Sequence, residues 1–325
     1  MKSFSYHQPK DIREASNLLG DNWQDALLNA GGTDLLGLIK HDIEKPDHLV
    51  NLKAVKDLDK VRYQEGKGLS IGALVKLNDL AAMDIVQNKY TVLAEALQET
   101  ASPQLRNMGT IGGNLCQRPR CWYFRGDFDC LRKGGELCFA ADGENKYHCI
   151  SGGGPCFIVH PSDPAVALLA LDASVTIAGK DREYTVPLHD FFVLPEDDVM
   201  RENILQPHEI VTRIHVPDLP SNTRSGYIKF KERDVWDFAV VSVAAVLRMG
   251  SERIEGGTMA FGGVAPKPWM EKTINDALNR MEVTDTNLDS LAQIAFTDAL
   301  PLAQNGYKIP LVRNLIKRVI RTLNA

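Results

Sequence analysis

Two stretches decide how this chain folds: Ala30-Gly31-Gly32-Thr33-Asp34 and Thr110-Ile111-Gly112-Gly113-Asn114. The first follows an apolar run at residues 26–30 that is typical of a strand, and it precedes a helical pattern at residues 35–40. A strand, a glycine turn and a helix together place bare backbone amides at a helix N-terminus, where they attract phosphate. Glycine is required because a Cβ would block close approach of the backbone to a ligand.

Taken alone, the first loop is better explained as a tight turn with Thr33 as a helix cap, since short motifs often match by chance. The second loop shifts the balance, because two Gly-Gly loops with polar ends can hold both sides of one pyrophosphate. Asp34 adds a negative charge that would repel phosphate, so we expect its carboxylate to turn toward amides or a ribose. The run Gly66–Gly72 has the wrong spacing for a nicotinamide-binding fingerprint and continues into a strand, which argues against a Rossmann fold.

Composition indicates a globular protein of two or three domains, with 325 residues of which 44% are hydrophobic. A net charge of -5 provides no basic field for nucleic acid or anionic membrane. The first residues contain no apolar run typical of a signal peptide, and no segment has the apolar length of a membrane span. We therefore expect a cytoplasmic protein, or a periplasmic one only if a partner with its own signal carries it across.

The order of expected elements divides the chain at about residue 178 and predicts an α+β fold. Residues 1 to about 55 form a small strand-helix-strand unit, and residues 56–178 are mixed, with a cysteine-rich insertion at about 115–157. Residues 179–325 are expected to form a separate domain of antiparallel strands followed by helices. Its strands are predicted at residues 210–216, 238–249 and 258–261.

All six cysteines fall within about one eighth of the chain, which suggests a shared role. Disulfides are disfavoured in a chain without a signal peptide, and zinc is disfavoured because there is no Cys-x-x-Cys pair. An iron–sulfur cluster is the third interpretation, and nearby arginines and lysines would offset its negative charge. Spacing alone leaves zinc and iron–sulfur open. The cysteines are Cys116, Cys121, Cys130, Cys138, Cys149 and Cys156.

Four separated motifs carry a resemblance that covers nearly the whole chain. They are Gly-Gly-Thr-Asp at 31–34, Arg106-Asn107 followed by Thr-Ile-Gly-Gly-Asn at 110–114, His-Pro-Ser-Asp at 160–163 before Leu-Asp-Ala at 171–173, and Gly-Gly-Val-Ala-Pro-Lys-Pro-Trp at 262–269. In this order they resemble the FAD-binding medium subunits of the xanthine dehydrogenase and molybdenum hydroxylase family.

The resemblance implies a fold and a cofactor. The fold is a vanillyl-alcohol-oxidase (PCMH)-type FAD-binding domain in two subdomains, followed by a C-terminal domain of antiparallel strands and helices. Lys229 lies in a segment similar to the one that approaches the flavin ring in that family, where a cation would stabilise the reduced flavin. The FAD contacts implied are Leu28, Asn29, Ala30, Gly31, Gly32, Thr33, Asp34, Leu35, Thr110, Ile111, Gly112, Gly113, Asn114, Asp163 and Lys229.

The cysteine insertion resembles the branch that contains 4-hydroxybenzoyl-CoA reductase and the periplasmic aldehyde oxidoreductases, whose medium subunits carry an extra [4Fe-4S] cluster. The matching ligands are Cys121, Cys130, Cys138 and Cys156. Cys116 and Cys149 depart from that pattern, and Cys149 leaves the fourth ligand open.

The resemblance also implies partners and a role. A small subunit with [2Fe-2S] clusters and a large subunit with a molybdenum cofactor would pass electrons to this flavin, and substrate chemistry would occur in the large subunit. No catalytic residue is expected in this chain. Two other functions remain open: a zinc-binding assembly subunit whose glycine loops are only turns, and a self-contained flavin oxidase.

Overall fold

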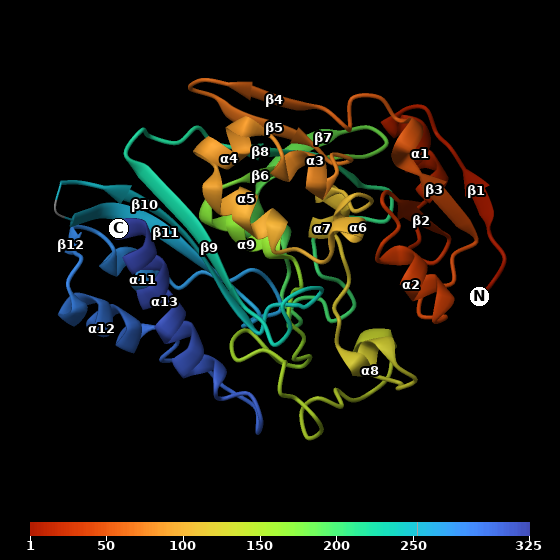
Figure 1. Cartoon of the computed structure of the whole chain (residues 1–325). Helices are drawn as coiled ribbons and strands as arrows, with labels where there is room; N and C mark the ends of the chain where they lie inside the picture. The colour runs from red at the N-terminus through yellow and green to blue at the C-terminus, as the bar shows by residue number, and fades with distance from the viewer. Residues whose placement is uncertain (252) are drawn as a thin grey trace.

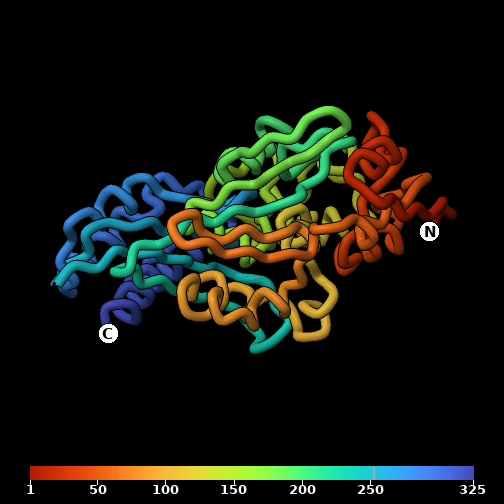
Figure 2. The backbone as a smooth tube through the Cα atoms, turned by 90° about the horizontal axis from the view of Figure 1, so that it is seen from above, coloured from red at the N-terminus to blue at the C-terminus, as the bar shows by residue number. Residues whose placement is uncertain are grey.

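Three sheets follow one another along the chain, and the computed structural model describes them over residues 1–251 and 253–325. In Figures 1 and 2 the N-terminal unit lies at one end of the molecule and the C-terminal strands and helices lie at the other. Mixed helices and sheets confirm the α+β class. None of the helices in the described ranges is long and apolar enough to cross a membrane.

The N-terminal unit is a parallel sheet of order β1-β3-β2 with helices between its strands. Helix α1 begins after Asp11, whose carboxylate accepts the amide of Glu14 at 2.8 Å and so satisfies one of the free amides there. Its apolar side packs with strands of the unit around Ala15, Leu19 and Val50. The elements are β1 (Ser5–His7), α1 (Ile12–Leu19), β2 (Ala26–Asn29), α2 (Leu35–Lys40), β3 (His48–Asn51) and the 3-10 turn Leu52–Ala54.

The middle of the chain is organised around an antiparallel sheet of order β4-β5-β8-β6-β7. Its strands are β4 (Val61–Gln64), β5 (Gly68–Gly72), β6 (Ser174–Ala178), β7 (Glu183–Pro187) and β8 (Ile210–Val216). The helices around it are α3 (Leu77–Ala81), α4 (Asp84–Lys89), α5 (Thr91–Gln98), α6 (Pro103–Arg106), α7 (Ile111–Leu115), α9 (Asp163–Ala170) and α10 (Leu188–Phe191).

Strand β8 corrects one expectation from the sequence. Residues 210–216 form a strand with the expected bounds, but it pairs with β5 and β6 rather than with the C-terminal strands. Its buried side chains, among them Ile214 and Val216, complete the core of the middle sheet. Alternation of apolar residues predicts a strand but not its partner, so this sheet extends beyond residue 178 to Val216.

The cysteine-rich insertion contains little regular structure, only α8 (Trp122–Arg125) and the 3-10 turn Leu131–Lys133. Packed aromatic rings hold it together. Tyr123 lies edge-on to Phe128, with ring centroids 5.0 Å apart, and stacks on Phe139 at 5.9 Å. Such contacts provide the ordered interior that a segment without long helices or strands otherwise lacks.

The C-terminal part is an antiparallel sheet of order β12-β11-β10-β9 with helices on it. Helix α9 is buried along its whole length and packs against α5, β10 and β11, so it joins this sheet to the middle of the chain. The elements are β9 (Thr223–Phe230), β10 (Val241–Met249), β11 (Arg253–Gly262), α11 (Lys272–Ala277), β12 (Met281–Glu282), α12 (Asp285–Ile294) and α13 (Lys308–Asn324).

Candidate functional site

The two glycine loops lie against each other although about 80 residues separate them. A Cβ on Gly31 would stand 2.2 Å from the carbonyl oxygen of Met108 and 2.9 Å from the Cα of Gly109, so only glycine allows this approach. Gly32 has a φ of +73°, in the left-handed region that glycine adopts without strain. Tertiary structure thus brings both loops to one place.

The second loop forms the first turn of the short helix α7. Thr110 is its N-cap, and its hydroxyl accepts the amide of Gly113 at 3.2 Å. Gly112 packs against Ala73, because a Cβ there would approach the Ala73 Cβ to 2.7 Å. The Gly112 amide donates to the Ala73 carbonyl at 2.9 Å, and the Gly113 amide to Thr110, so both amides are already bonded within the protein and these glycines serve the close packing of the loop.

A cavity of ≈610 Å³ opens in front of the two loops, within the size range of cofactor sites. Residues from the N-terminal unit, the middle sheet and the C-terminal part contribute to its wall. Of the residues expected to contact FAD, twelve line it: Leu28, Ala30, Gly31, Gly32, Thr33, Asp34, Leu35, Thr110, Gly112, Gly113, Asn114 and Asp163.

Three of the expected residues do not line this cavity. Asn29 ends β2 with its Oδ1 buried and without a hydrogen-bond donor, 3.0 Å from where a Cβ on Gly32 would lie. Ile111 is fully buried in the core. Lys229 lies behind Asp163, and its Nζ donates to Asp163 Oδ2 at 2.8 Å and to the carbonyl of Glu99 at 2.9 Å.

Asp163 is the buried acid at the wall of the cavity. It is not the helix cap, since Ser162 accepts the amide of Ala165 at 3.1 Å. Its Oδ1 instead accepts the Tyr227 hydroxyl at 2.6 Å. Burial raises the pKa of Asp163, and the charge of Lys229 opposes that rise. Lys229 thus acts on the cavity through Asp163.

A second hollow of ≈650 Å³ adjoins the loops and shares Ala30 and Thr110 with the cavity. Four lysines line it, with Asp57 and Asp59 as the acidic side chains among them. An excess of positive charge beside the loops favours a polyanionic group such as a pyrophosphate. The lysines are Lys53, Lys56, Lys60 and Lys76.

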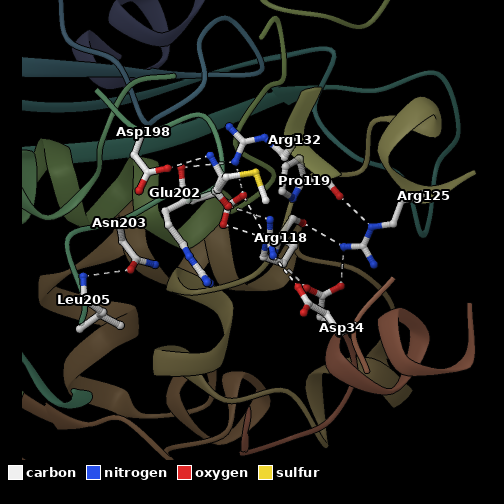
Figure 3. Close-up of polar contacts among 12 residues, drawn as sticks. Asp34, Arg118, Pro119, Arg125, Arg132, Asp198, Glu202, Asn203 and Leu205 are labelled. Atoms are coloured by element: carbon white, nitrogen blue, oxygen red, sulfur yellow. Dashed lines mark hydrogen bonds and ion pairs between the residues drawn. The ribbon is translucent and has the colours of Figure 1, made fainter. Parts of the chain in front are cut away.

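Asp34 faces the cysteine insertion, where arginine side chains and a backbone amide balance its negative charge. Its carboxylate pairs with Arg120 at 2.6 Å and Arg125 at 2.8 Å, and accepts the Arg118 amide at 2.8 Å. Arg118 also donates from Nε to Glu202 at 3.1 Å, and Figure 3 shows it between Asp34 and Glu202. The first loop and the insertion therefore share one ionic network.

The four expected cysteine ligands all lie in the insertion. Cys121 and Cys130 pack in one small cluster with Leu38 and Phe124, and the Cys121 Sγ lies 3.3 Å from His148 Nε2. The Cys138 and Cys156 thiols influence each other's pKa. Cys149 also interacts with Cys156, whereas Cys116 interacts with Glu202. Within residues 1–251 and 253–325, no three His, Cys, Asp or Glu side chains surround a point closely enough to hold one metal ion.

Burial raises the pKa of the Cys121 thiol, and the nearby amides of Phe124 and Tyr123 oppose that rise. The pKa of Cys156 falls to about 6, first because Cys138 donates to it and then because the Arg132 charge stabilises its thiolate against the effect of burial. The two neighbours that favour a thiolate at Cys156 are therefore Cys138 and Arg132.

Sequence reasoning missed the side of the cavity formed by residues 201–211. These residues lie far along the chain from both loops, and no local pattern distinguishes them from an ordinary connection, so only the fold could bring them to the site. Members of this wall are Arg201, Glu202, Asn203, Leu205, Pro207, Glu209, Ile210 and Val211.

Comparisons with known proteins agree with this geometry. Residues 2–219 match the FAD binding domain in molybdopterin dehydrogenase, and residues 226–323 match the CO dehydrogenase flavoprotein C-terminal domain. The chain is 37% identical over its whole length to the aldehyde oxidoreductase FAD-binding subunit PaoB of Escherichia coli strain K12, covering 99% of that protein. It is 29% identical to the carbon monoxide dehydrogenase medium chain of Hydrogenophaga pseudoflava, with 98% of this chain and 96% of that one covered.

A solved structure shares the arrangement of the elements. Carbon monoxide dehydrogenase from Hydrogenophaga pseudoflava, in a form lacking the Mo-pyranopterin moiety, superposes with a TM-score of 0.78 at 26% identity over 98% of this chain and 96% of that one. The chain therefore belongs to the family of FAD-binding medium subunits of xanthine dehydrogenase and CO dehydrogenase.

Proposed function

We propose that this chain passes electrons through FAD, between a partner subunit with [2Fe-2S] clusters and an external acceptor, within a molybdenum hydroxylase-type oxidoreductase. The observation that carries the proposal is the single cavity lined by both glycine loops and by Asp163. Substrate chemistry is assigned to a large molybdenum-cofactor subunit, because the relatives are FAD-binding subunits or medium chains of larger oxidoreductases.

The residues of the cavity fit FAD. Gly31 lets the first loop pack against the Met108–Gly109 backbone and Gly112 lets the second loop pack against Ala73, and so both loops line one cavity. The lysines of the neighbouring hollow supply charge for a pyrophosphate. When bound, FAD supplies the redox chemistry, while this chain binds it, orients it and sets the charge around it.

The donor set of the insertion fits a [4Fe-4S] cluster held by Cys121, Cys130, Cys138 and Cys156. All six cysteines are free of disulfides, and Cys121 and Cys130 pack in one small cluster. A zinc site instead requires four donors around one point.

Spectroscopy of the purified chain tests both cofactors together. We expect flavin absorption bands together with a broad brown absorption that dithionite bleaches. Chemical analysis should find iron and labile sulfide in equal amounts, as a [4Fe-4S] cluster requires. A colourless protein containing zinc would support the assembly-subunit alternative and would overturn this proposal. Turnover of an aldehyde by this chain without partners would instead identify a self-contained oxidase.

Cysteine variants test the ligand assignment. Cys130→Ser should remove iron and leave FAD bound, because the thiol belongs to the insertion and does not line the cavity. Cys116→Ser is the matched control and should retain iron, since Cys116 interacts with Glu202 rather than with the other thiols. Unchanged iron in Cys130→Ser would show that other thiolates hold the metal.

A further inference from the structure

Arg132 is a buried charged side chain in a part of the protein with little regular structure. Only 2% of it is exposed, and it belongs to the 3-10 turn Leu131–Lys133. Its Nη1 donates to Glu202 Oε1 at 2.6 Å and to the Arg201 carbonyl at 3.3 Å. Its Nε and Nη2 are buried and have no acceptor.

Such an arrangement is costly unless another group completes it. A guanidinium remains charged in a protein interior, and each buried donor left unpaired loses the hydrogen bonds it had with water. Glu202 balances the charge but occupies only one of the nitrogens. An acceptor for the other two is therefore expected on the side of Arg132 away from Glu202.

The proposed cluster ligands lie beside the guanidinium. Arg132 is two residues after Cys130, and Cys130 is the N-cap of the 3-10 turn that contains Arg132, so the guanidinium belongs to the segment that carries a proposed ligand. Sulfur ligands and inorganic sulfides accept hydrogen bonds from such donors, and these bonds influence the reduction potential. The free donors and the missing acceptor thus meet at one place.

We propose that Arg132 is a positioning residue of the [4Fe-4S] site, donating its free N–H groups to sulfur and raising the reduction potential of the cluster through its charge. The inference rests on the cluster assigned under the proposed function. A cluster held by four thiolates becomes more negative on reduction, so a buried cation beside it stabilises the reduced form.

Glu202 has the opposite influence on the same site. Its side chain is 3% exposed and is held by Arg118 as well as Arg132. It fixes the guanidinium in place, and its negative charge partly offsets that of Arg132. Removing the charge of Glu202 should therefore shift the potential in the direction opposite to removing that of Arg132.

An EPR-monitored redox titration of the full chain, purified without oxygen, measures this effect. In Arg132→Gln, the ratio of reduced to oxidised cluster at the wild-type midpoint should fall about tenfold, which corresponds to 59 mV for a one-electron couple. Glu202→Gln should raise the ratio, and Arg132→Lys should restore part of it. Arg182→Gln is the matched control, because Arg182 also pairs with a buried glutamate, Glu209, but lies elsewhere and is 66% exposed.

Opposite shifts in Arg132→Gln and Glu202→Gln support the proposal, because general damage to the fold would not move the potential in two directions. Iron lost from Arg132→Gln but retained in Arg132→Lys also supports it, since it shows that the site needs a cation. Midpoints equal to that of Arg182→Gln, at full iron content, would overturn it. If Arg132→Gln does not fold, the midpoints of Arg132→Lys and Glu202→Gln are compared with that of Arg182→Gln instead, and equal midpoints again overturn the proposal. A wild-type chain without iron overturns the cluster itself, which separates that failure from the failure of Arg132.

Discussion

Gly31→Ala is the sharpest test of the two-loop site. The added Cβ would stand 2.2 Å from the Met108 carbonyl oxygen, whereas ordinary contacts begin at 3.4 Å, so the loops must separate by roughly 1 Å. Backbone lies on both sides of this contact, and no side chain can rotate away to relieve it. Overpacking of this kind costs about 1–3 kcal/mol.

We expect that cost to weaken FAD binding by roughly 5- to 150-fold, because the displaced loops no longer line one cavity in the same arrangement. The assay is titration of the flavin-free chain with FAD, followed by the change in flavin fluorescence. Thermal unfolding in the absence of FAD shows how much of the cost falls on the fold itself.

Gly37→Ala is the matched control for Gly31→Ala. Gly37 lies in helix α2 directly after the first loop, and a Cβ there meets no atom within 4 Å. Alanine should stabilise this helix by about 0.5–1 kcal/mol and leave FAD affinity unchanged. Wild-type affinity in Gly31→Ala would refute the idea that close contact of the loops forms the site.

Three further predictions concern buried or partly buried polar groups. Lys229→Met should lower the free energy of unfolding by about 3–5 kcal/mol in urea titrations, because it leaves Asp163 buried without its cation. Lys231 is partly exposed, so Lys231→Met should lower it by less than about 1 kcal/mol. Equal losses in the two variants would contradict this reasoning. Burial lowers the pKa of His160 to about 3 in the folded chain. In the unfolded chain the imidazole has its ordinary pKa of 6.5, so between pH 7 and pH 5 only the unfolded chain takes up a proton at this residue. The free energy of unfolding therefore falls as the pH drops from 7 to 5. In His160→Leu, the decrease in the free energy of unfolding between pH 7 and pH 5 should be smaller by about 2 kcal/mol. If urea titrations at the two pH values give the same decrease as in the wild type, His160 is not the group responsible. Asp34→Asn should lower the free energy of unfolding by about 1–3 kcal/mol, because Arg120 and Arg125 lose their carboxylate partner. An unchanged free energy of unfolding in urea titration would show that these ion pairs are weak.

Much of the local structure could be read from the sequence. Helix α2 and strand β8 have the bounds that periodicity predicts, because the spacing of apolar residues reflects which face each element buries. The α+β class follows from the order of these patterns, and the family follows from four separated motifs. Strand partners could not be read in the same way, and β8 therefore joins a sheet other than the expected one.

The amino-acid sequence by itself determined that two glycine loops and a set of clustered cysteines would exist, since each depends on residue type and local spacing. Only the tertiary structure decided that Gly31 meets Met108, that Lys229 acts through Asp163, and that Arg132 meets Glu202. These contacts join residues distant in the chain, so their energies depend on how the sheets pack. The physical reason is that local pattern specifies which face an element buries, whereas the choice of partner is made by the whole core.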